Sequence, residues 1–281
     1  MKLLIGLECT LLVLLTLAAM PAIRAQDGDR RKWIETVVPR MADAEAQLGH
    51  ARRLKREMAS KEGAEFAFWR KLAVEAYQAV RVFHPEARAS CVEAAFRAGE
   101  ILRAGGDDEA AIEEFRWSAE HGEGSDFRAR ARLEIGHIQR RAGRWREALE
   151  AYLDVTSDAK ASDARREDAW LWAGNAWCAL DRADDARLAW ERVAEKGTDP
   201  LARVQAFDEL AMQLLSRDDL EGAAGMLDRC ARALTPRALE ETELGERVRN
   251  ALLRMRVVEE LPRAIARRND SSVASGTPRK S

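Results

Sequence analysis

The sequence holds little of what a metal site or a disulfide-bonded scaffold requires. Its 281 residues include only four cysteines and four histidines, with no H-E-x-x-H motif and no cysteine pair at the spacing of a zinc site. Beyond residue 25 the cysteines are Cys91, Cys178 and Cys230, an odd and widely spaced set, whereas disulfide scaffolds carry dense, even sets. Cys178 and Cys230 fall at helical repeat positions, so we expect both to be buried as small apolar residues. We expect neither a metal nor a cofactor.

An excess of one charge and the motifs of common enzymes are also missing. The formal net charge is -2 and the pI is about 6.2, so no basic excess indicates a nucleic-acid partner or an anionic membrane surface. The chain has no G-x-S-x-G elbow, phosphate loop or dinucleotide-binding fingerprint. Its composition, 47% hydrophobic and 33% charged, is that of a soluble helical protein. These features favour a non-enzymatic protein with a protein or peptide partner; the alternative is an enzyme or enzyme subunit with an unrecognised active site.

The first 25 residues differ in kind from the rest of the chain. A basic start is followed by an apolar run over residues 3–19 and by the small residue Ala25, a pattern typical of a secretory signal peptide. The run is short for a membrane span, and Glu8 interrupts it. We therefore expect an exported protein of the periplasm or cell envelope. The alternative is an uncleaved segment that tethers the scaffold to the membrane.

The most informative feature is an internal repeat. A small residue is followed after twelve positions by Ala and after four more by a bulky apolar residue. Four copies follow this pattern: Gly99/Ala111/Phe115, Gly136/Ala148/Tyr152, Gly174/Ala186/Trp190 and Ala211/Ala223/Leu227. From copy to copy the Ala advances by 37, 38 and 37 residues. A fixed period of this length predicts a stacked solenoid.

Each copy reads as a helical hairpin. In the third copy Trp170, Gly174 and Trp177 lie on one face of a first helix, at spacings of three and four. We expect the second helix to cross at Gly174, with Ala186 as its matching small residue and Trp190 filling the space beside it. Turn-forming residues separate the two helices in every copy, where Gly can end the first helix and Asp can cap the second.

The third copy resembles the tetratricopeptide (TPR) pattern W-x2-L-G-x2-Y, A-x3-F, P, with Pro200 ending the unit. The period exceeds the usual length of about 34 residues, and polar, turn-rich segments between the hairpins account for the surplus. In an exported chain this spacing is similar to the TPR domains of the periplasmic Tol-Pal coordinator family and of the assembly lipoprotein of the outer-membrane barrel machinery. The resemblance covers roughly residues 66–230, and the chain lacks the acceptor cysteine of the lipoprotein. It implies a scaffold or adaptor for protein-protein interactions.

The sequence therefore predicts an all-α fold: a right-handed α-solenoid of stacked antiparallel helical hairpins, with an N-terminal helical hairpin and a C-terminal capping helix. We expect the following parts: a signal peptide (1–25), an N-terminal helical region with a degenerate repeat (26–88), four TPR-like repeats (89–235), a capping helix that begins at Thr235-Pro236 and runs through 236–268, and a disordered tail (269–281). A coiled-coil helix for oligomerisation in the N-terminal region is an alternative, and the oligomeric state stays open.

A partner would bind on the concave face formed by the first helices. By the phase of the repeat, its lining comprises Glu93, Phe96, Glu100, Arg103, Arg130, Leu133, His137, Arg140, Arg141, Asp168, Leu171 and Asn175. We hypothesise that Leu133 and Leu171 form an apolar floor for a peptide segment of a partner. Its carboxylates would be bound by Arg103, Arg140 and Arg141. Trp172 lies off the core phase and is a further candidate for surface contact. The alternative is a groove filled by the chain's own terminal helix, or simply solvated.

Overall fold

The computed structural model describes residues 27–274, and in that range every regular element is a helix. The expected signal peptide (1–25) and the last part of the expected tail (275–281) lie outside the described residues. The chain divides into two compact units, the first ending at Ala87 and the second beginning at Arg88. Among the described residues, no helix combines the length and the apolar character that crossing a bilayer requires.

The first unit is a helical hairpin with one additional helix. Helices α3 (Ala44–Ala59) and α4 (Gly63–Phe83) pack against each other, and α2 (Asp27–Val37) packs on α4. The buried amide of Gln47 fixes the connection between α2 and α3, because it accepts a hydrogen bond from the Met41 backbone N–H and donates one to the Pro39 carbonyl. Trp33 donates its indole N–H to Glu75 at 2.7 Å, which joins α2 to α4.

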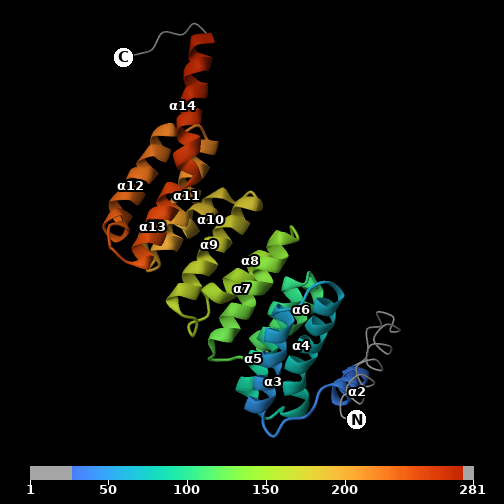
Figure 1. Cartoon of the computed structure of the whole chain (residues 1–281). Helices are drawn as coiled ribbons and strands as arrows, with labels where there is room; N and C mark the ends of the chain where they lie inside the picture. Colours follow the sequence, from blue (N-terminus) through green and yellow to red (C-terminus); the bar gives the residue numbers. More distant parts are fainter. Residues whose placement is uncertain (1–26, 275–281) are drawn as a thin grey trace. The chain divides into compact units, whose positions relative to one another are not determined.

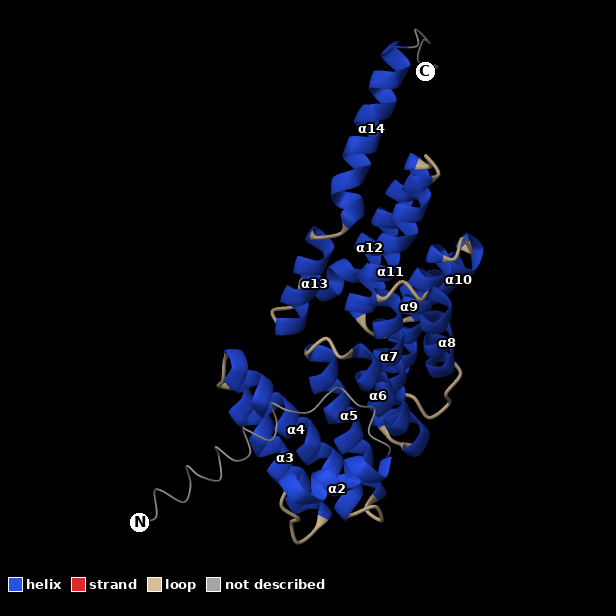
Figure 2. Cartoon of the chain, turned by 90° about the vertical axis from the view of Figure 1, so that its right-hand side faces the viewer, coloured by secondary structure: helices blue, strands red, loops and turns tan. Residues whose placement is uncertain are grey.

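The second unit begins with four stacked hairpins (Figures 1 and 2). They are α5 (Arg88–Ala104) with α6 (Asp108–His121), α7 (Asp126–Arg141) with α8 (Trp145–Thr156), α9 (Asp163–Ala179) with α10 (Ala183–Lys196), and α11 (Pro200–Ser216) with α12 (Leu220–Ala238). Each helix packs on the next one in the chain, and each first helix also contacts the first helix of the following hairpin. The expected solenoid of antiparallel hairpins is confirmed.

The small residue of each glycine-bearing repeat meets an aromatic ring of the second helix. A Cβ atom on Gly99 would lie 2.8 Å from Cε1 of Phe115, and one on Gly174 would lie 2.6 Å from Cδ1 of Trp190. The same arrangement recurs at Gly136. We expected the backbones of two helices to meet at Gly174; instead, the three atoms nearest to that Cβ position belong to the Trp190 ring. The glycine therefore makes room for an aromatic side chain.

The turn inside each hairpin places one residue in the left-handed region, always seven positions after the small residue. These residues are Gly106 (φ 79°), Gly143 (φ 72°), Asp181 (φ 59°) and Asp218 (φ 58°). In all four turns the following N–H bonds back to the carbonyl five residues earlier, as in a Schellman motif. Asp219 caps the second helix by accepting from the Gly222 N–H, whereas Asp107 makes no such side-chain bond. The expected Asp cap therefore forms in the fourth hairpin and not in the first.

The end of the second unit differs from the expected single capping helix. The prediction that a helix starts at Thr235-Pro236 is wrong, because α12 continues to Ala238 with Pro236 in its last turn, where the missing N–H removes only one helical hydrogen bond. Two helices follow, α13 (Glu243–Leu253) and α14 (Arg256–Ala274), and both pack against α11 and α12. Helix α14 thus extends past residue 269, where we expected the tail to begin.

Candidate partner-binding face

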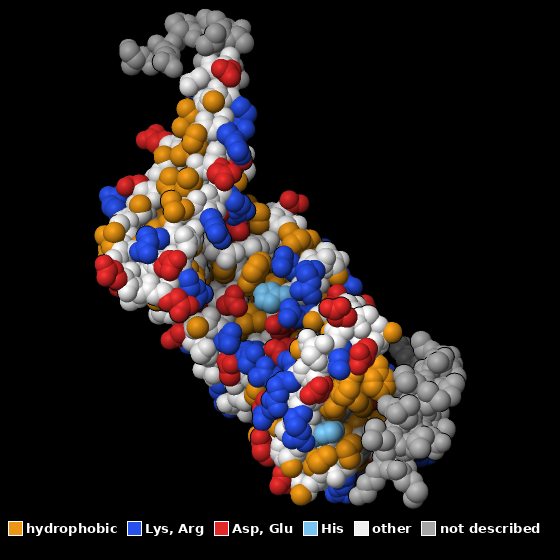
Figure 3. All heavy atoms as spheres, in the orientation of Figure 1, with side chains coloured by type: hydrophobic (Ala, Val, Ile, Leu, Met, Phe, Trp, Pro, Cys, Tyr) orange, Lys and Arg blue, Asp and Glu red, His pale blue; other side chains and the backbone are white. Residues whose placement is uncertain are grey.

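The candidate site lies on the second unit, on the side formed by the first helix of each hairpin: α5, α7, α9 and α11. We call this side the first-helix face. Helices α5, α7 and α9 follow one another along it. Figure 3 shows basic, acidic and apolar side chains mixed over α7 and α9. The residues expected to line this face are Glu93, Phe96, Glu100 and Arg103 on α5, Arg130, Leu133, His137, Arg140 and Arg141 on α7, and Asp168, Leu171 and Asn175 on α9.

Three of these residues belong to the core instead. Phe96, Leu133 and Leu171 are only 1%, 3% and 2% exposed, and all three are part of the apolar clusters between the helices. Each lies three residues before the small residue of its helix, on the same helical side, and therefore points into the packed interior. The predicted apolar floor of Leu133 and Leu171 is wrong, because neither side chain is accessible to a partner.

The α5 end of the face is an internally satisfied charge cluster. Arg130 lies over the rings of Phe96 and Phe127, with its guanidinium carbon 4.4 Å and 5.5 Å from their centroids, and it pairs with Glu100 at 3.7 Å. Arg97 in turn pairs with both Glu93 and Glu100, at 3.7 and 3.0 Å. These charges neutralise one another, so this end offers little net attraction to an ionic partner.

Two further predicted arginines also have carboxylate partners. Arg103 pairs with Glu134 across α5 and α7 at 3.3 Å, and Arg141 pairs with Asp108 at 3.7 Å. Burial raises the pKa of Glu134, while the nearby Arg103 opposes that rise. Arg103 and Arg141 are therefore less available to a partner's carboxylate than we expected.

Arg140 differs from the other arginines of the face, since it has no ion pair with any residue that the structure describes. Its guanidinium carbon lies 4.5 Å from the ring centroid of Trp172 on the next first helix, in cation-π contact. The Trp172 indole N–H donates to Asp168 at 2.9 Å. Burial raises the pKa of Asp168, and the hydrogen bond from Trp172 opposes the rise. Trp172 thus joins Arg140 and Asp168 in one half-buried cluster.

His137 shows the electrostatic character of this cluster. It shares a hydrogen bond of 2.9 Å with the Tyr152 hydroxyl and meets Trp172 edge-on, with ring centroids 5.2 Å apart. Burial, and to a lesser extent the positive charges of Arg140 and Arg141, lower the pKa of His137 to about 4. The positive charges of Arg140 and Arg141 therefore make the region around His137 less favourable for an additional cation.

The C-terminal end of the face is occupied by the chain itself. Asn175 accepts the Trp190 indole N–H at 3.0 Å, so its amide oxygen is already used. On α11, Glu209 stands where Trp172 stands on α9, two residues before the small residue, and it pairs with Arg256 of α14 at 2.7 Å. The buried carboxylate of Asp208 accepts from Arg256 Nε and from the Val257 backbone N–H. The start of the chain's terminal helix thus packs against α11.

The sequence analysis missed two contributors, Glu134 and Phe127, and the repeat phase could have found the first of them. Glu134 lies two residues before Gly136, the same position that Trp172 takes before Gly174. This position points outward on each first helix, whereas the position three before points inward. Phe127 lies near the start of α7 and carries no comparable repeat signal. Its role beside Arg130 becomes apparent only from the contact between helices.

The three cysteines within residues 27–274 are free thiols, and one of them is not where we expected it. Cys91 and Cys230 are buried, and burial raises the pKa of Cys230 to about 12. Cys178 is exposed, because it lies four residues after Gly174, beyond the packed part of α9. The prediction of a buried Cys178 is therefore wrong. No group of three or more His, Cys, Asp or Glu side chains within residues 27–274 is placed to hold a metal ion.

Known structures share the fold of this chain. No protein-family model matches the chain, and no curated protein matches its sequence. The nearly identical TPR-like repeats of a candidate kinesin light chain of Podosopora anserina superpose with a TM-score of 0.50 at 16% identity, covering 72% of this chain and 100% of that chain. BtubC (BKLC) from P. vanneervenii gives 0.49 at 17% identity over 81% and 96% of the two chains, and MamA gives 0.48 at 16% over 64% and 99%.

At this level of identity the comparison with the Podosopora repeats establishes the fold alone. The chain has an all-helical, TPR-like repeat fold, as its sequence predicted. Stacked hairpins of this kind form an extended surface along their first helices.

Proposed function

We propose that the protein is an exported, non-enzymatic scaffold of the bacterial cell envelope that binds an acidic segment of a partner protein on its first-helix face. The TPR-like fold supports an interaction role. The signal-peptide pattern of residues 1–25 supports export. The long repeat period, similar to that of the Tol-Pal coordinator family and the outer-membrane assembly lipoprotein, supports a place in the envelope.

The observation that supports an acidic partner is that Arg140 lacks a carboxylate partner among the described residues. This residue lies over Trp172 and contributes to the low pKa of the neighbouring His137. A partner carboxylate beside Arg140 would form a charge-assisted hydrogen bond, and its apolar neighbours would contact Trp172. The contact lies between the neutralised cluster on α5 and the end covered by α14, so it is centred on α7 and α9.

Site-specific cross-linking tests this proposal. A photoreactive amino acid replaces Ala164, which is exposed on α9 one turn before Asp168, and in a control it replaces Leu188, which is 57% exposed on α10. In native envelopes we expect the Ala164 probe to cross-link one partner at a segment rich in Asp and Glu. Equal cross-linking from both positions, or a neutral or basic segment, would contradict the proposal.

The cross-linked segment, made as a peptide, then measures the part played by Arg140. We expect Arg140→Gln to weaken its binding about tenfold, which corresponds to about 1.4 kcal/mol. Arg116→Gln is the matched control, because Arg116 is exposed on α6 and has no ion pair among the described residues. Equal affinities of the two variants would remove Arg140 from the interface.

A further inference from the structure

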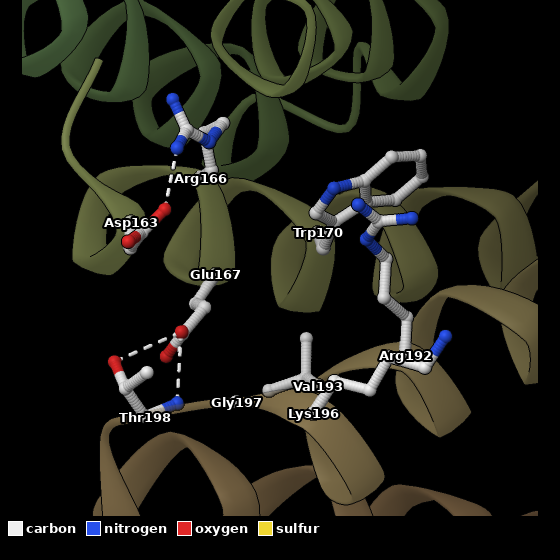
Figure 4. A pocket seen from close by; sticks show the side chains of 9 residues that line it. All are labelled: Asp163, Arg166, Glu167, Trp170, Arg192, Val193, Lys196, Gly197 and Thr198. Carbon is white, nitrogen blue, oxygen red and sulfur yellow. Dashed lines mark hydrogen bonds and ion pairs between the residues drawn. The ribbon is translucent and has the colours of Figure 1, made fainter.

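A cavity of about 260 Å³ lies between α9, the end of α10 and the loop that follows (Figure 4). Trp170 lies in its wall, and the charged residues around it are Asp163, Arg166 and Glu167 on α9 and Arg192 and Lys196 on α10. Trp170 and Trp172 are separated by about 200° around the helix, so this cavity opens on a different side of α9 from the first-helix face.

Both carboxylates of the cavity are already engaged. Asp163 pairs with Arg166, which also donates to backbone carbonyls. Glu167 accepts three hydrogen bonds, from the N–H and the hydroxyl of Thr198 and from the N–H of Asp199, at 2.8, 3.0 and 3.0 Å. Figure 4 shows Glu167 directed at Thr198 and away from Arg192.

The two cations on α10 have no carboxylate partner among the described residues. Arg192 and Lys196 are four residues apart and therefore lie on one side of the helix, where like charges repel. The guanidinium carbon of Arg192 lies 5.0 Å from the Trp170 ring centroid, and Figure 4 shows the two side chains next to each other. An anion between these side chains would relieve the repulsion and would lie beside an apolar aromatic surface.

Size and charge together define the ligand. The cavity is smaller than the roughly 300 to 1,000 Å³ of typical small-molecule sites, which favours one side chain of a larger molecule. Its three cations and two carboxylates leave 3 - 2 = +1 charge, which complements a carboxylate better than a phosphate dianion. We propose that the Trp170 cavity binds an Asp or Glu side chain of a partner polypeptide, with an apolar neighbour of that residue against Trp170.

The indole N–H resonances of the purified full chain, labelled with ¹⁵N, test this proposal without a known partner. Trp170→Phe identifies the signal of Trp170. The probes are acetyl-Leu-Glu-Leu-amide, the same peptide with Gln in place of Glu, and inorganic phosphate. We expect the Glu peptide to shift the Trp170 signal in a saturable manner, at least fivefold more tightly than the Gln peptide. An unshifted Trp170 signal, equal affinity of the two peptides, or tighter binding of phosphate would overturn the proposal.

Variants locate the binding determinants. We expect the double variant Arg192→Gln/Lys196→Gln to bind the Glu peptide at least tenfold more weakly and Arg192→Lys, which keeps the charge, to retain most of the affinity. Arg116→Gln on α6 is again the control, and circular dichroism verifies that each variant is folded. Unchanged affinity of the folded double variant would overturn the proposal. Because Arg140 takes no part in this site, Arg140→Gln should leave the titration unchanged, so failure of the proposed function and failure of this inference are distinguishable.

Discussion

The indole ring of Trp190 lies directly against Gly174, where a Cβ atom would be 2.6 Å from its Cδ1 atom. We therefore predict that Gly174→Ala destabilises the protein, although alanine normally favours a helix by up to about 1 kcal/mol over glycine. The buried Trp190 ring must shift within a packed core, and overpacking of this kind costs about 1 to 3 kcal/mol. Urea unfolding followed by circular dichroism measures the change in the free energy of unfolding.

Gly225 provides the matched control. It also lies within a helix, α12, but a Cβ atom there would meet nothing within 4 Å. Gly225→Ala should therefore stabilise the protein by up to about 1 kcal/mol. If both alanine variants shift stability in the same direction, the contact with Trp190 does not determine the need for glycine.

The hairpin turns give a second prediction. Asp181 and Asp218 occupy the left-handed region that glycine occupies in the first two repeats, with φ of 59° and 58°. Glycine adopts this conformation without the steric cost of a Cβ atom. Asp181→Gly and Asp218→Gly should each stabilise the protein by as much as about 1 kcal/mol, and Gly143→Ala should destabilise it by a similar amount. A loss of thermal stability in both Asp variants would contradict this account.

The fold was predictable because its determinants repeat. The same packing contact, a glycine against an aromatic ring of the second helix, occurs at Gly99, Gly136 and Gly174. A prediction based on this repeated spacing does not depend on any single residue. The end of α12 lacks that support. Pro236 alone indicated a new helix, and a single proline in a last turn is too weak a signal to fix the boundary.

The candidate face was harder to predict because a helical side spans several residues. Leu133 and His137 are one turn apart, yet Leu133 is buried and His137 is half-buried at the cluster around Trp172. The position of each residue in the repeat predicted the same face for both, because it gives the direction of a side chain around the helix axis only approximately. Which arginines have partners depends on contacts between helices far apart in sequence. The sequence shows Arg103 and Arg140 as equivalent, and only the structure pairs Arg103 with Glu134.

His137 predicts how stability depends on pH. Its pKa is about 4 in the folded protein, lowered from 6.5, so above pH 6.5 it is neutral in both the folded and unfolded states and contributes no pH dependence. Between pH 6.5 and 4 the unfolded chain binds a proton that the folded protein does not, so the free energy of unfolding decreases as the pH is lowered through this range. The full loss is at most about 3.5 kcal/mol, from a shift of 6.5 - 4 = 2.5 pKa units at about 1.4 kcal/mol per unit.

The variant His137→Gln isolates this contribution. Urea unfolding at pH 7.5 and pH 4.5 gives the pH-dependent difference in stability for each protein. Wild type should lose more stability on acidification than the variant, since glutamine does not titrate. The variant will be less stable at pH 7.5, because its contact with Tyr152 changes, but that loss cancels in the comparison across pH. An equal acid-dependent loss in both proteins would show that His137 is not the group responsible.

Asp208 predicts what holds the terminal helix on α11. Asp208 is 7% exposed, and its carboxylate accepts hydrogen bonds from Arg256 Nε at 2.7 Å and from the Val257 N–H at 3.0 Å. These donors lie in the first turn of α14, where a negative charge is favoured. Asp208→Asn removes that charge and leaves one oxygen to accept both bonds. We expect a loss of about 2 kcal/mol in the free energy that holds α14 in place, in the range for hydrogen bonds to charged groups.

Hydrogen exchange resolves this effect along the chain, because it reports local opening separately from global unfolding. In Asp208→Asn, amides of α14 packed against α11 and α12 should exchange faster, by roughly 30-fold for 2 kcal/mol, while those of α7 stay protected. Glu209→Gln is the matched comparison: Glu209 pairs with the same arginine at 2.7 Å but receives no backbone N–H among the described residues, so its effect should be smaller. Faster exchange throughout the second unit in Asp208→Asn would contradict this prediction. It would show that the Asp208 carboxylate stabilises the whole stack of hairpins and not the α11–α14 contact alone.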